Sequence, residues 1–265
     1  MIFEKLKYRF ELAPEYSELK PWVCELNSTF STSGISIFKS RNEVKIFSVG
    51  NYQLNVKSFK IPNLINRVAY VYFRGSKAER SFRYARKFLL LGVNTPSAIG
   101  YLDVVERGLL KQSYYVSLHF NADFTLREVL NYKVDNREEI IRQWVNFTYA
   151  NLHQNNIFHL DYSPGNTLIS SIDGRYVFQV VDLNRMSFGS IDFVKGLSNF
   201  RQLDTDISTL EFIAAQYATI CDEDIKTATK LLLGFDQKNK ASRKFRGDMK
   251  QVLRSFLGLK SDSED

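Results

Sequence analysis

Apolar and polar residues alternate in short runs through the first part of the chain, and the spacing lengthens to that of helices after residue 120. Strict alternation is typical of half-buried strands. Five strands are predicted, at residues 35–39, 43–47, 52–59, 98–105 and 113–120. The Val-Gly-Asn sequence at 49–51 favours a tight hairpin turn. These runs predict a small antiparallel sheet.

One helix is predicted among these strands, from Ser76 to Leu91. Its apolar residues recur at helical spacing on one face, and Gly92 follows as a stop signal. Its first residues, Ser-Lys-Ala-Glu, have the form of a capping box, in which the serine side chain binds the backbone of the fourth residue.

The chain becomes mostly helical after residue 121. Helices are predicted at 125–131, at 137–154 and repeatedly between 192 and 257, with a β-hairpin formed by residues 167–171 and 176–182. The pattern therefore predicts an α+β fold of two parts. Residues 1–120 form a β-rich domain with one helix, residues 121–265 form a mostly helical domain, and the short polar segment 121–123 is the expected hinge. The pattern assigns no role to residues 1–34.

Composition excludes several classes of protein. The opening residues mix charges into every apolar run, and no segment approaches the ~20 consecutive apolar residues of a membrane span. The two cysteines, Cys24 and Cys221, lie in unrelated contexts, which fits two unpaired thiols in a reducing compartment. The sequence thus predicts a cytoplasmic globular protein.

The formal net charge of +7 is concentrated in one block. Between Lys39 and Lys87 there are twelve Lys or Arg residues against two acids. Such a block attracts nucleotide phosphates, an acidic membrane surface or a phosphorylated substrate, although a basic face kept for solubility would look the same. Because the block has no recognisable reading helix or aromatic RNA motif, no nucleic acid partner is expected.

The segment Phe-His-Leu-Asp-Tyr-Ser-Pro-Gly-Asn at 158–166 reads as a rigid turn that carries Asp161 and Asn166. The strand downstream ends at Asp182, which we expect beside this turn. Carboxylate and carboxamide oxygens suit Mg²⁺, and one carboxylate would remain to accept a proton from an attacking hydroxyl. Phosphoryl transfer needs this combination, together with a lysine to position the phosphates. Lys57 in a predicted strand and Glu79 on the predicted helix could supply the lysine and its partner.

The order Lys57, Glu79, His-Leu-Asp-Tyr-Ser-Pro-Gly-Asn, Asp182 resembles the protein-kinase-like superfamily. More narrowly, residues 76–102, 152–169 and 180–188 resemble the bacterial lipopolysaccharide core sugar kinases, which phosphorylate Kdo or heptose. The resemblance covers roughly residues 35–200. It implies a two-lobed kinase-like fold and an ATP- and Mg²⁺-dependent phosphotransferase.

The resemblance also implies roles for individual residues. Asp161 would be the general base or would orient the hydroxyl, Asn166 and Asp182 would bind Mg²⁺, and His159 would brace the catalytic loop. Three of these residues could instead have a purely structural role. Asn166 could serve the turn, Asp182 could end a strand, and Asp161 could be an ordinary turn aspartate.

In the first domain, the resemblance implies that Lys57 contacts the ATP phosphates and that Glu79 pairs with Lys57. Lys60, three residues further on, is a rival for the role of Lys57. A helix cap alone could account for Glu79.

Three features depart from the protein kinase pattern. The phosphate-covering segment has no glycine-rich loop. Either Lys39, Ser40 and Arg41 cover the phosphates with side chains and backbone amides, which is the expectation here, or the loop is open. Asp-Leu-Asn replaces Asp-Phe-Gly at 182–184, and no Ala-Pro-Glu follows it. Little room remains for a peptide-docking segment, which disfavours a protein substrate.

The expected function is phosphorylation of a lipid-linked inner-core sugar at the cytoplasmic membrane face. An anionic membrane surface would attract a basic block formed by Arg67, Arg74, Arg80 and Arg83. Two alternatives stay open: a kinase of another small-molecule or protein hydroxyl, and a non-catalytic pseudokinase scaffold. The acceptor sugar and the oligomeric state do not follow from the sequence.

Overall fold

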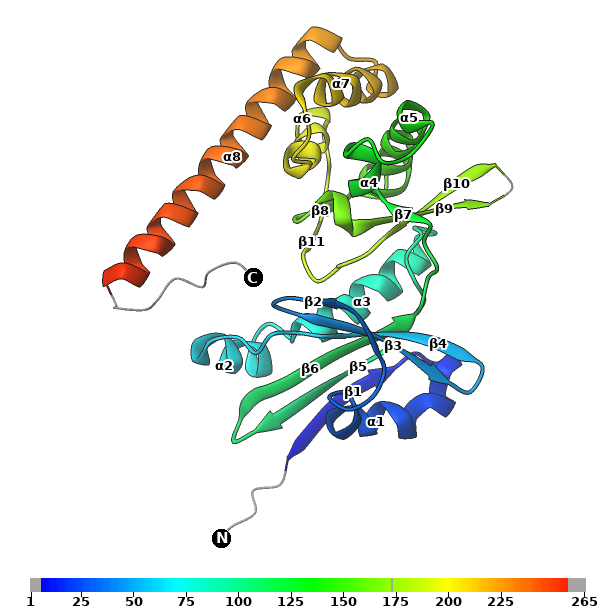
Figure 1. Cartoon of the computed structure of the whole chain (residues 1–265), viewed down its shortest axis with the longest axis vertical. Coiled ribbons are helices and arrows are strands. Elements are labelled where there is room, and N and C mark those ends of the chain that lie inside the picture. Colours follow the sequence, from blue (N-terminus) through cyan, green and yellow to red (C-terminus); the bar gives the residue numbers. More distant parts are fainter. Residues whose placement is uncertain (1–5, 173, 257–265) are drawn as a thin grey trace. The chain divides into compact units, whose positions relative to one another are not determined.

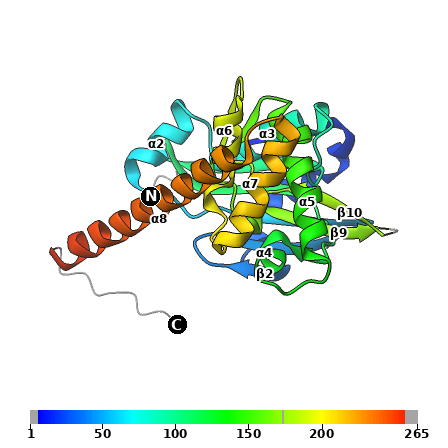
Figure 2. The ribbon, with the colours of Figure 1, turned by 90° about the horizontal axis from the view of Figure 1, so that it is seen from above.

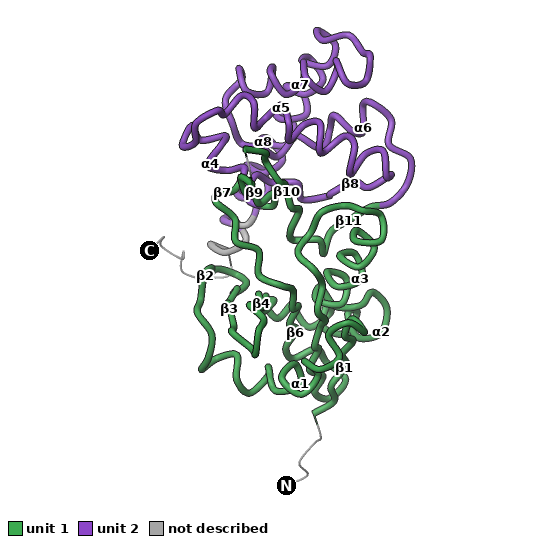
Figure 3. The backbone as a smooth tube through the Cα atoms, turned by 90° about the vertical axis from the view of Figure 1, so that its right-hand side faces the viewer, with its two compact units in different colours: residues 1–125, 166–187 green, residues 126–165, 188–265 purple. Residues whose placement is uncertain are grey.

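A computed structural model describes residues 6–172 and 174–256. The chain divides into two compact units, residues 1–125 with 166–187, and residues 126–165 with 188–265 (Figure 3). Along the chain, the first boundary between the two units thus falls after Thr125. The β-hairpin that we predicted in the second domain belongs to the first unit. Asp123 of the expected hinge is held within that unit, since its backbone N–H donates to Ile169 O (2.9 Å) and its carboxylate accepts from Ser171 N (2.7 Å).

The first unit is built on a six-stranded antiparallel sheet with strand order β1-β5-β6-β4-β3-β2 (Figure 1). The strands are β1 (Lys7–Leu12), β2 (Ile35–Lys39), β3 (Glu43–Val49), β4 (Tyr52–Ser58), β5 (Ala98–Glu106) and β6 (Leu109–Leu118). All five predicted strands are present, and Gly50 takes the positive φ (56°) that the turn between β3 and β4 needs.

Two helices cover opposite faces of this sheet. Helix α1 (Lys20–Thr29) joins a core with the even-numbered residues Leu54 and Val56 of β4. Helix α3 (Lys77–Leu90) packs Phe82 against Tyr101 of β5. Tyr101 pairs with Tyr115 on the next strand, and Tyr115 pairs with Lys57 on the strand after that, so these residues share one face of the sheet. Because side chains alternate along a strand, Lys57 points to the α3 face.

The β-rich unit holds more than the predicted single helix. A short 3-10 helix (Pro14–Leu19), α1 and α2 (Leu64–Tyr72) accompany α3, and β1 adds an edge strand. The predicted helix is confirmed as α3, and Ser76 caps it by accepting a hydrogen bond from Glu79 N (2.9 Å). A small sheet of β7 (Phe124–Thr125), β9 (Thr167–Ile172) and β10 (Arg175–Val180) completes the unit.

The second unit is mostly helical, as predicted. Its helices are α4 (Leu126–Leu130), α5 (Arg137–Phe147) with a π-helical turn (Thr148–His153), α6 (Phe193–Leu197) with a 3-10 turn (Ser198–Gln202), α7 (Ile207–Cys221) and α8 (Ile225–Phe256). Trp144 stacks on Tyr162 and meets Phe200 edge-on, so aromatic residues form its core. Asp206 caps α7 through a hydrogen bond from Thr209 N (2.8 Å).

Strand β8 (Ile157–His159) and a 3-10 turn (Pro164–Asn166) form the two ends of the predicted catalytic segment, and the short strand β11 (Met186–Phe188) follows Asp182 in the chain. None of the helices within residues 6–172 and 174–256 combines the length and the apolar character that crossing a bilayer requires.

Candidate active site

Lys57 and Asp182 form an ion pair within the first unit. The Lys57 Nζ atom lies 2.6 Å from Asp182 Oδ1, and both side chains are largely withdrawn from solvent. Lys57 comes from β4 and Asp182 from just after β10, so 125 residues of chain separate the two. The Lys57 ammonium also lies 5.3 Å from the centre of the Phe59 ring. The structure therefore brings together two of the positions expected to serve ATP and Mg²⁺.

Asn166 lies beside this pair. The N–H of Val181, the residue before Asp182, donates to the Asn166 backbone oxygen (2.9 Å), so the ends of β9 and β10 meet here. Asp182 itself has a positive φ of 60°, which is uncommon for a residue other than glycine. Its Oδ1 accepts a hydrogen bond from the Asn184 side chain. An aspartate held in a costly backbone conformation by its neighbours is a frequent mark of a functional position.

Glu79 does not pair with Lys57, and this expectation was wrong for the structure described. The buried Glu79 carboxylate binds two arginines instead, Arg9 at 3.1 Å and Arg83 at 2.8 Å. The physical reason is the unpredicted strand β1, which places Arg9 next to α3. Arg83 is one helical turn away on the same helix, so both cations reach Glu79 more easily than Lys57 does.

Arg80 links α3 to the segment that carries Asp182. Its Nε atom donates to the Asn184 backbone oxygen (3.1 Å), and its Nη1 atom donates to Gly75 O (2.9 Å). The guanidinium also lies over the Tyr70 ring (5.3 Å). Sequence reasoning missed this contact, because no pattern relates an arginine on a helix to a carbonyl 104 residues later.

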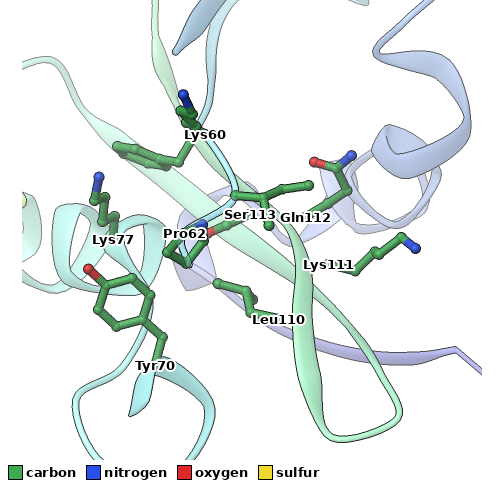
Figure 4. A pocket seen from close by; sticks show the side chains of 10 residues that line it. Lys60, Pro62, Tyr70, Lys77, Leu110, Lys111, Gln112 and Ser113 are labelled. Carbon is green, nitrogen blue, oxygen red and sulfur yellow. The ribbon is translucent and has the colours of Figure 1, made fainter. Parts of the chain in front are cut away.

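Lys60, the rival of Lys57, lies elsewhere. It lines a shallow hollow together with Pro62, Tyr70, Lys77 and residues 110–113 (Figure 4). Its backbone N–H donates to Asn42 Oδ1 (3.1 Å), and its side chain is exposed. Lys57 has an acidic partner, Asp182, although the resemblance calls for Glu79 in that place.

The residues expected to cover the phosphates form the exposed turn between β2 and β3. The Ser40 N–H donates to Asn42 O (2.9 Å), which closes the turn, and Lys39 Nζ lies 4.0 Å from Glu43. Strand β3 then pairs with β4 so that Val44 lies opposite Lys57. The register therefore puts Ser40 and Arg41 at the end of the sheet where Lys57 stands.

In the second unit, His159 holds the backbone of Asp161. The buried His159 ring accepts a hydrogen bond from Asp161 N through Nδ1 (3.1 Å), and the His159 carbonyl accepts one from Asn199 Nδ2 (2.8 Å). The next side chain, Tyr162, is fixed by Trp144 Nε1 (3.0 Å) and Thr148 Oγ1 (2.9 Å). The loop that presents Asp161 is thus anchored at several points.

A buried histidine supports this loop from behind. His153 Nδ1 lies 2.8 Å from the Tyr217 hydroxyl, and its Nε2 lies 3.2 Å from Asn199 Oδ1. Burial lowers the pKa of His153 to about 4, against a smaller opposing effect of Asn199, so the ring is neutral at physiological pH. Sequence reasoning assigned His153 to structure but could not find Asn199 and Tyr217, its partners from later helices.

Arg201 is a further residue of this region that sequence reasoning missed. Burial lowers the pKa of its guanidinium, and the Asp161 carboxylate acts in the opposite direction by favouring the charged form. The guanidinium lies over the Phe158 ring (5.5 Å) and donates to Ser198 O (2.8 Å). Arg201 is therefore a cation held in place within the electrostatic reach of Asp161.

Part of the basic block is paired within the protein. Arg67 donates to Leu110 O (2.8 Å), Arg80 donates to Asn184 O and Gly75 O, and Arg83 forms an ion pair with Glu79. Of the four arginines expected to face a membrane, three therefore have partners in the fold, although the Arg83 side chain stays 63% exposed.

The residues present fit a Mg²⁺ ion bound together with a nucleotide. Within the described residues no group of three or more His, Cys, Asp or Glu side chains could hold a metal by itself. Mg²⁺ typically uses one or two protein ligands plus substrate phosphates and water. One carboxylate, Asp182, and one carboxamide, Asn166, at adjoining strand ends match this donor set.

Comparison with known proteins gives a match of fold alone. No family model and no curated protein matches the sequence. Among solved structures, WaaP in complex with acyl carrier protein is similar with a TM-score of 0.57 and 14% identity, over 88% of this chain and 98% of that one.

Two weaker matches were also found. The Rio2 kinase complex with ADP, Mg²⁺ and phosphoaspartate from Chaetomium thermophilum has a TM-score of 0.49 and 13% identity, over 91% of this chain and 76% of that one. Aminoglycoside phosphotransferase APH(4)-Ia in its apo form has a TM-score of 0.41 and 14% identity, over 85% and 93%. The WaaP match shows that the two chains have a similar fold, an antiparallel sheet with a mostly helical part.

Proposed function

We propose that this chain is an ATP- and Mg²⁺-dependent kinase that phosphorylates a sugar hydroxyl of the lipopolysaccharide inner core, on Kdo or heptose. The observation that carries the proposal is the 2.6 Å contact between Lys57 and Asp182, with Asn166 beside it, in a chain of kinase-like fold. The sequence independently predicts phosphate and metal binding for these three residues.

In this proposal Lys57 binds the α- and β-phosphates of ATP, and Asn166 and Asp182 hold Mg²⁺. When bound, the ion would neutralise phosphate charge and orient the transferred group. The Lys57 ammonium then pairs with phosphate oxygens while staying near Asp182. Ser40 and Arg41, at the same end of the sheet, would cover the phosphates in place of a glycine-rich loop. Arg80 is a positioning residue, because it fixes the turn at Asn184.

Asp161 would orient the acceptor hydroxyl and accept its proton. A bond then forms between the acceptor oxygen and the γ-phosphorus while the bond from that phosphorus to ADP breaks. His159 keeps Asp161 in place through the Asp161 N–H, and the neutral His153 supports the same loop through Asn199.

The acceptor is proposed from the narrower resemblance. Residues 152–169 and 180–188 resemble the lipopolysaccharide core sugar kinases, and the similarity of fold to WaaP covers 88% of this chain. Only ten residues separate Asp182 from the start of α6 at Phe193, which leaves little room to dock a peptide. The proposed acceptor is a lipid-linked sugar, met at the cytoplasmic face of the membrane.

A non-catalytic scaffold is the alternative that one observation favours. Glu79 is bound by Arg9 and Arg83, so the lysine–glutamate pair expected of an active kinase is missing from this structure. A kinase of another small-molecule hydroxyl uses the same residues and differs only in the acceptor.

Purified protein tests these possibilities in two steps. A saturating concentration of Mg-ATP should raise the thermal midpoint, since ligand at a hundredfold its Kd stabilises by about 2.7 kcal/mol. ATP turnover with an inner-core acceptor should then disappear in Asp161→Asn while the thermal shift remains. Binding without turnover by the wild type would support the scaffold, and turnover only with other alcohols would reassign the acceptor.

A further inference from the structure

The second half of α8 is a helical arm exposed to solvent. The first half packs into its unit with buried Ala228, Leu232 and Asp236. From Lys240 to Met249 every side chain is exposed, and Figure 2 shows the helix running on well past α7. We call residues 238–252 the α8 arm. A helix that leaves its own core needs another source of stabilisation, because isolated helices of this length are marginal in water.

Large apolar side chains occupy one side of the α8 arm. Phe245, Met249 and Val252 follow each other at spacings of four and three residues and are 66%, 45% and 61% exposed. With 3.6 residues per turn, these positions lie on one face of the helix. An apolar stripe of this kind, exposed on a helix beyond the core, marks an interaction surface rather than a packing element.

Cations occupy the rest of the arm. Between residues 238 and 249 the sequence has five Lys or Arg residues and one acid, Asp248. Lys244 and Arg246 are next to Phe245 in the chain, so they flank the apolar stripe on its two sides. Lys240 pairs with the buried Asp236 (2.7 Å), and Arg243 reaches the exposed Asp204 only at 3.7 Å. An exposed pair such as Arg243 with Asp204 contributes little, and Lys238, Lys244 and Arg246 add further positive charge, so the arm keeps a positive field.

We propose that the α8 arm binds the surface of a membrane rich in anionic phospholipids. The helix would lie in the plane of the interface, with Phe245, Met249 and Val252 among the acyl chains and the flanking cations at the headgroups. Charge complementarity favours this occupant over a second copy of the chain, because two such arms side by side would repel. The inference extends the proposed function, which places the acceptor on a lipid, and assigns the membrane contact to a defined segment.

Helix α2 has a second exposed apolar face, but it lacks the positive charge of the α8 arm. Leu64, Ile65 and Tyr72 are exposed on one side of this helix. Its single charged residue, Arg67, donates to Leu110 O and so points into the fold. An anionic surface therefore fits the arm better than α2.

Sedimentation with lipid vesicles tests this assignment on the full chain. Wild-type protein should bind vesicles of phosphatidylcholine and phosphatidylglycerol, and bind pure phosphatidylcholine weakly. Two lysines or arginines near such a surface together account for roughly a thirtyfold difference in binding. Lys244→Glu with Arg246→Glu should therefore weaken binding at least that much, and Phe245→Ser with Met249→Ser should also weaken it. The matched control, Lys226→Glu with Lys230→Glu, changes the net charge equally on the first half of α8 and should bind like wild type.

Several results would overturn the assignment. These are equal binding to neutral vesicles, equal loss in the Lys226 and Lys230 control, or loss in Ile65→Ser with Tyr72→Ser while the arm variants bind normally. Binding of acyl carrier protein, the partner in the WaaP complex, and self-association of the chain are measured in parallel. If either of these requires Phe245 while the protein does not bind vesicles, the inference is also contradicted. Turnover of a soluble acceptor separates the two proposals, because it should survive every arm substitution even if vesicle binding fails.

Discussion

Replacing Gly196 with alanine should destabilise the helical unit, because α6 at this point leaves no room for a methyl group. A Cβ atom on Gly196 would overlap the Tyr217 hydroxyl and lie 3.0 Å from His153 Nδ1. Both neighbours are buried and joined by the 2.8 Å hydrogen bond behind the Asp161 loop. The substitution therefore forces the ring of Tyr217 or the helix to move and breaks a buried hydrogen bond.

The magnitude follows from three contributions. Overpacking a core costs about 1–3 kcal/mol, and leaving a buried hydroxyl or imidazole without its partner costs about 1–3 kcal/mol. Alanine regains up to about 1 kcal/mol of helix propensity over glycine. The net expectation is a loss of about 2–4 kcal/mol in the free energy of unfolding.

Urea unfolding, followed by helical circular dichroism, measures this loss through the shift in midpoint. Gly234→Ala is the matched control, because nothing lies within 4 Å of a Cβ at that helical position, so it should be neutral or stabilising. Adding Tyr217→Phe to Gly196→Ala removes the overlapping oxygen and should recover part of the loss, a coupling that a double-mutant cycle detects. Equal stabilities of Gly196→Ala and Gly234→Ala would refute the reasoning.

Three further substitutions have defined outcomes. Burial raises the pKa of Asp103 to about 6. The free energy of unfolding that this group contributes is fully present below about pH 4 and is lost, by roughly 3 kcal/mol, as the pH rises through about 6. Asp103→Asn should remove this slope from a plot of the urea midpoint against pH. Asp206→Ala should lower the free energy of unfolding by about 1 kcal/mol near neutral pH, because it removes the cap of α7. Burial alone would raise the pKa of Asp206, but hydrogen bonds from Ser208 and Thr209 outweigh it and hold this pKa far below its usual value. Thermal melts should therefore show the cost of the substitution shrinking only in strong acid. Lys57→Met should lower ATP turnover by roughly a hundredfold or more while Lys60→Met leaves it unchanged, and similar rates for the two variants would remove Lys57 from its proposed role.

The sheet and α3 could be predicted because their sequences carry strong local signals. Strands β2 to β4 alternate clearly, and Ser76 and Gly92 mark the ends of α3. Helix α2 gave no such signal, since its apolar face is exposed and its β-branched and aromatic residues also suit a strand. Helix α1 mixes polar residues into a short amphipathic stretch, and only packing against the sheet defines it.

The residues of the candidate site could be predicted where residue type and order along the chain identify them. Their partners could not be predicted where residues distant in sequence supply the contact. Lys57 and Asp182 were selected by type and position, and the fold brings them together. The partner of Glu79 depended on Arg9 in the unpredicted strand β1, so the expected ion pair was wrong. Asn199 and Arg201 near the Asp161 loop come from a later helical turn, and no local spacing connects them to Asp161.

The central claim is that Asp161 takes part in phosphate transfer to an inner-core sugar. The most direct measurement is the mass of lipopolysaccharide from cells in which the chain is either wild type or Asp161→Ala, with both proteins present in equal amounts. We predict inner-core species that carry one phosphate group in the wild-type cells and lack it in the variant. Equal phosphate content in the two would contradict the account.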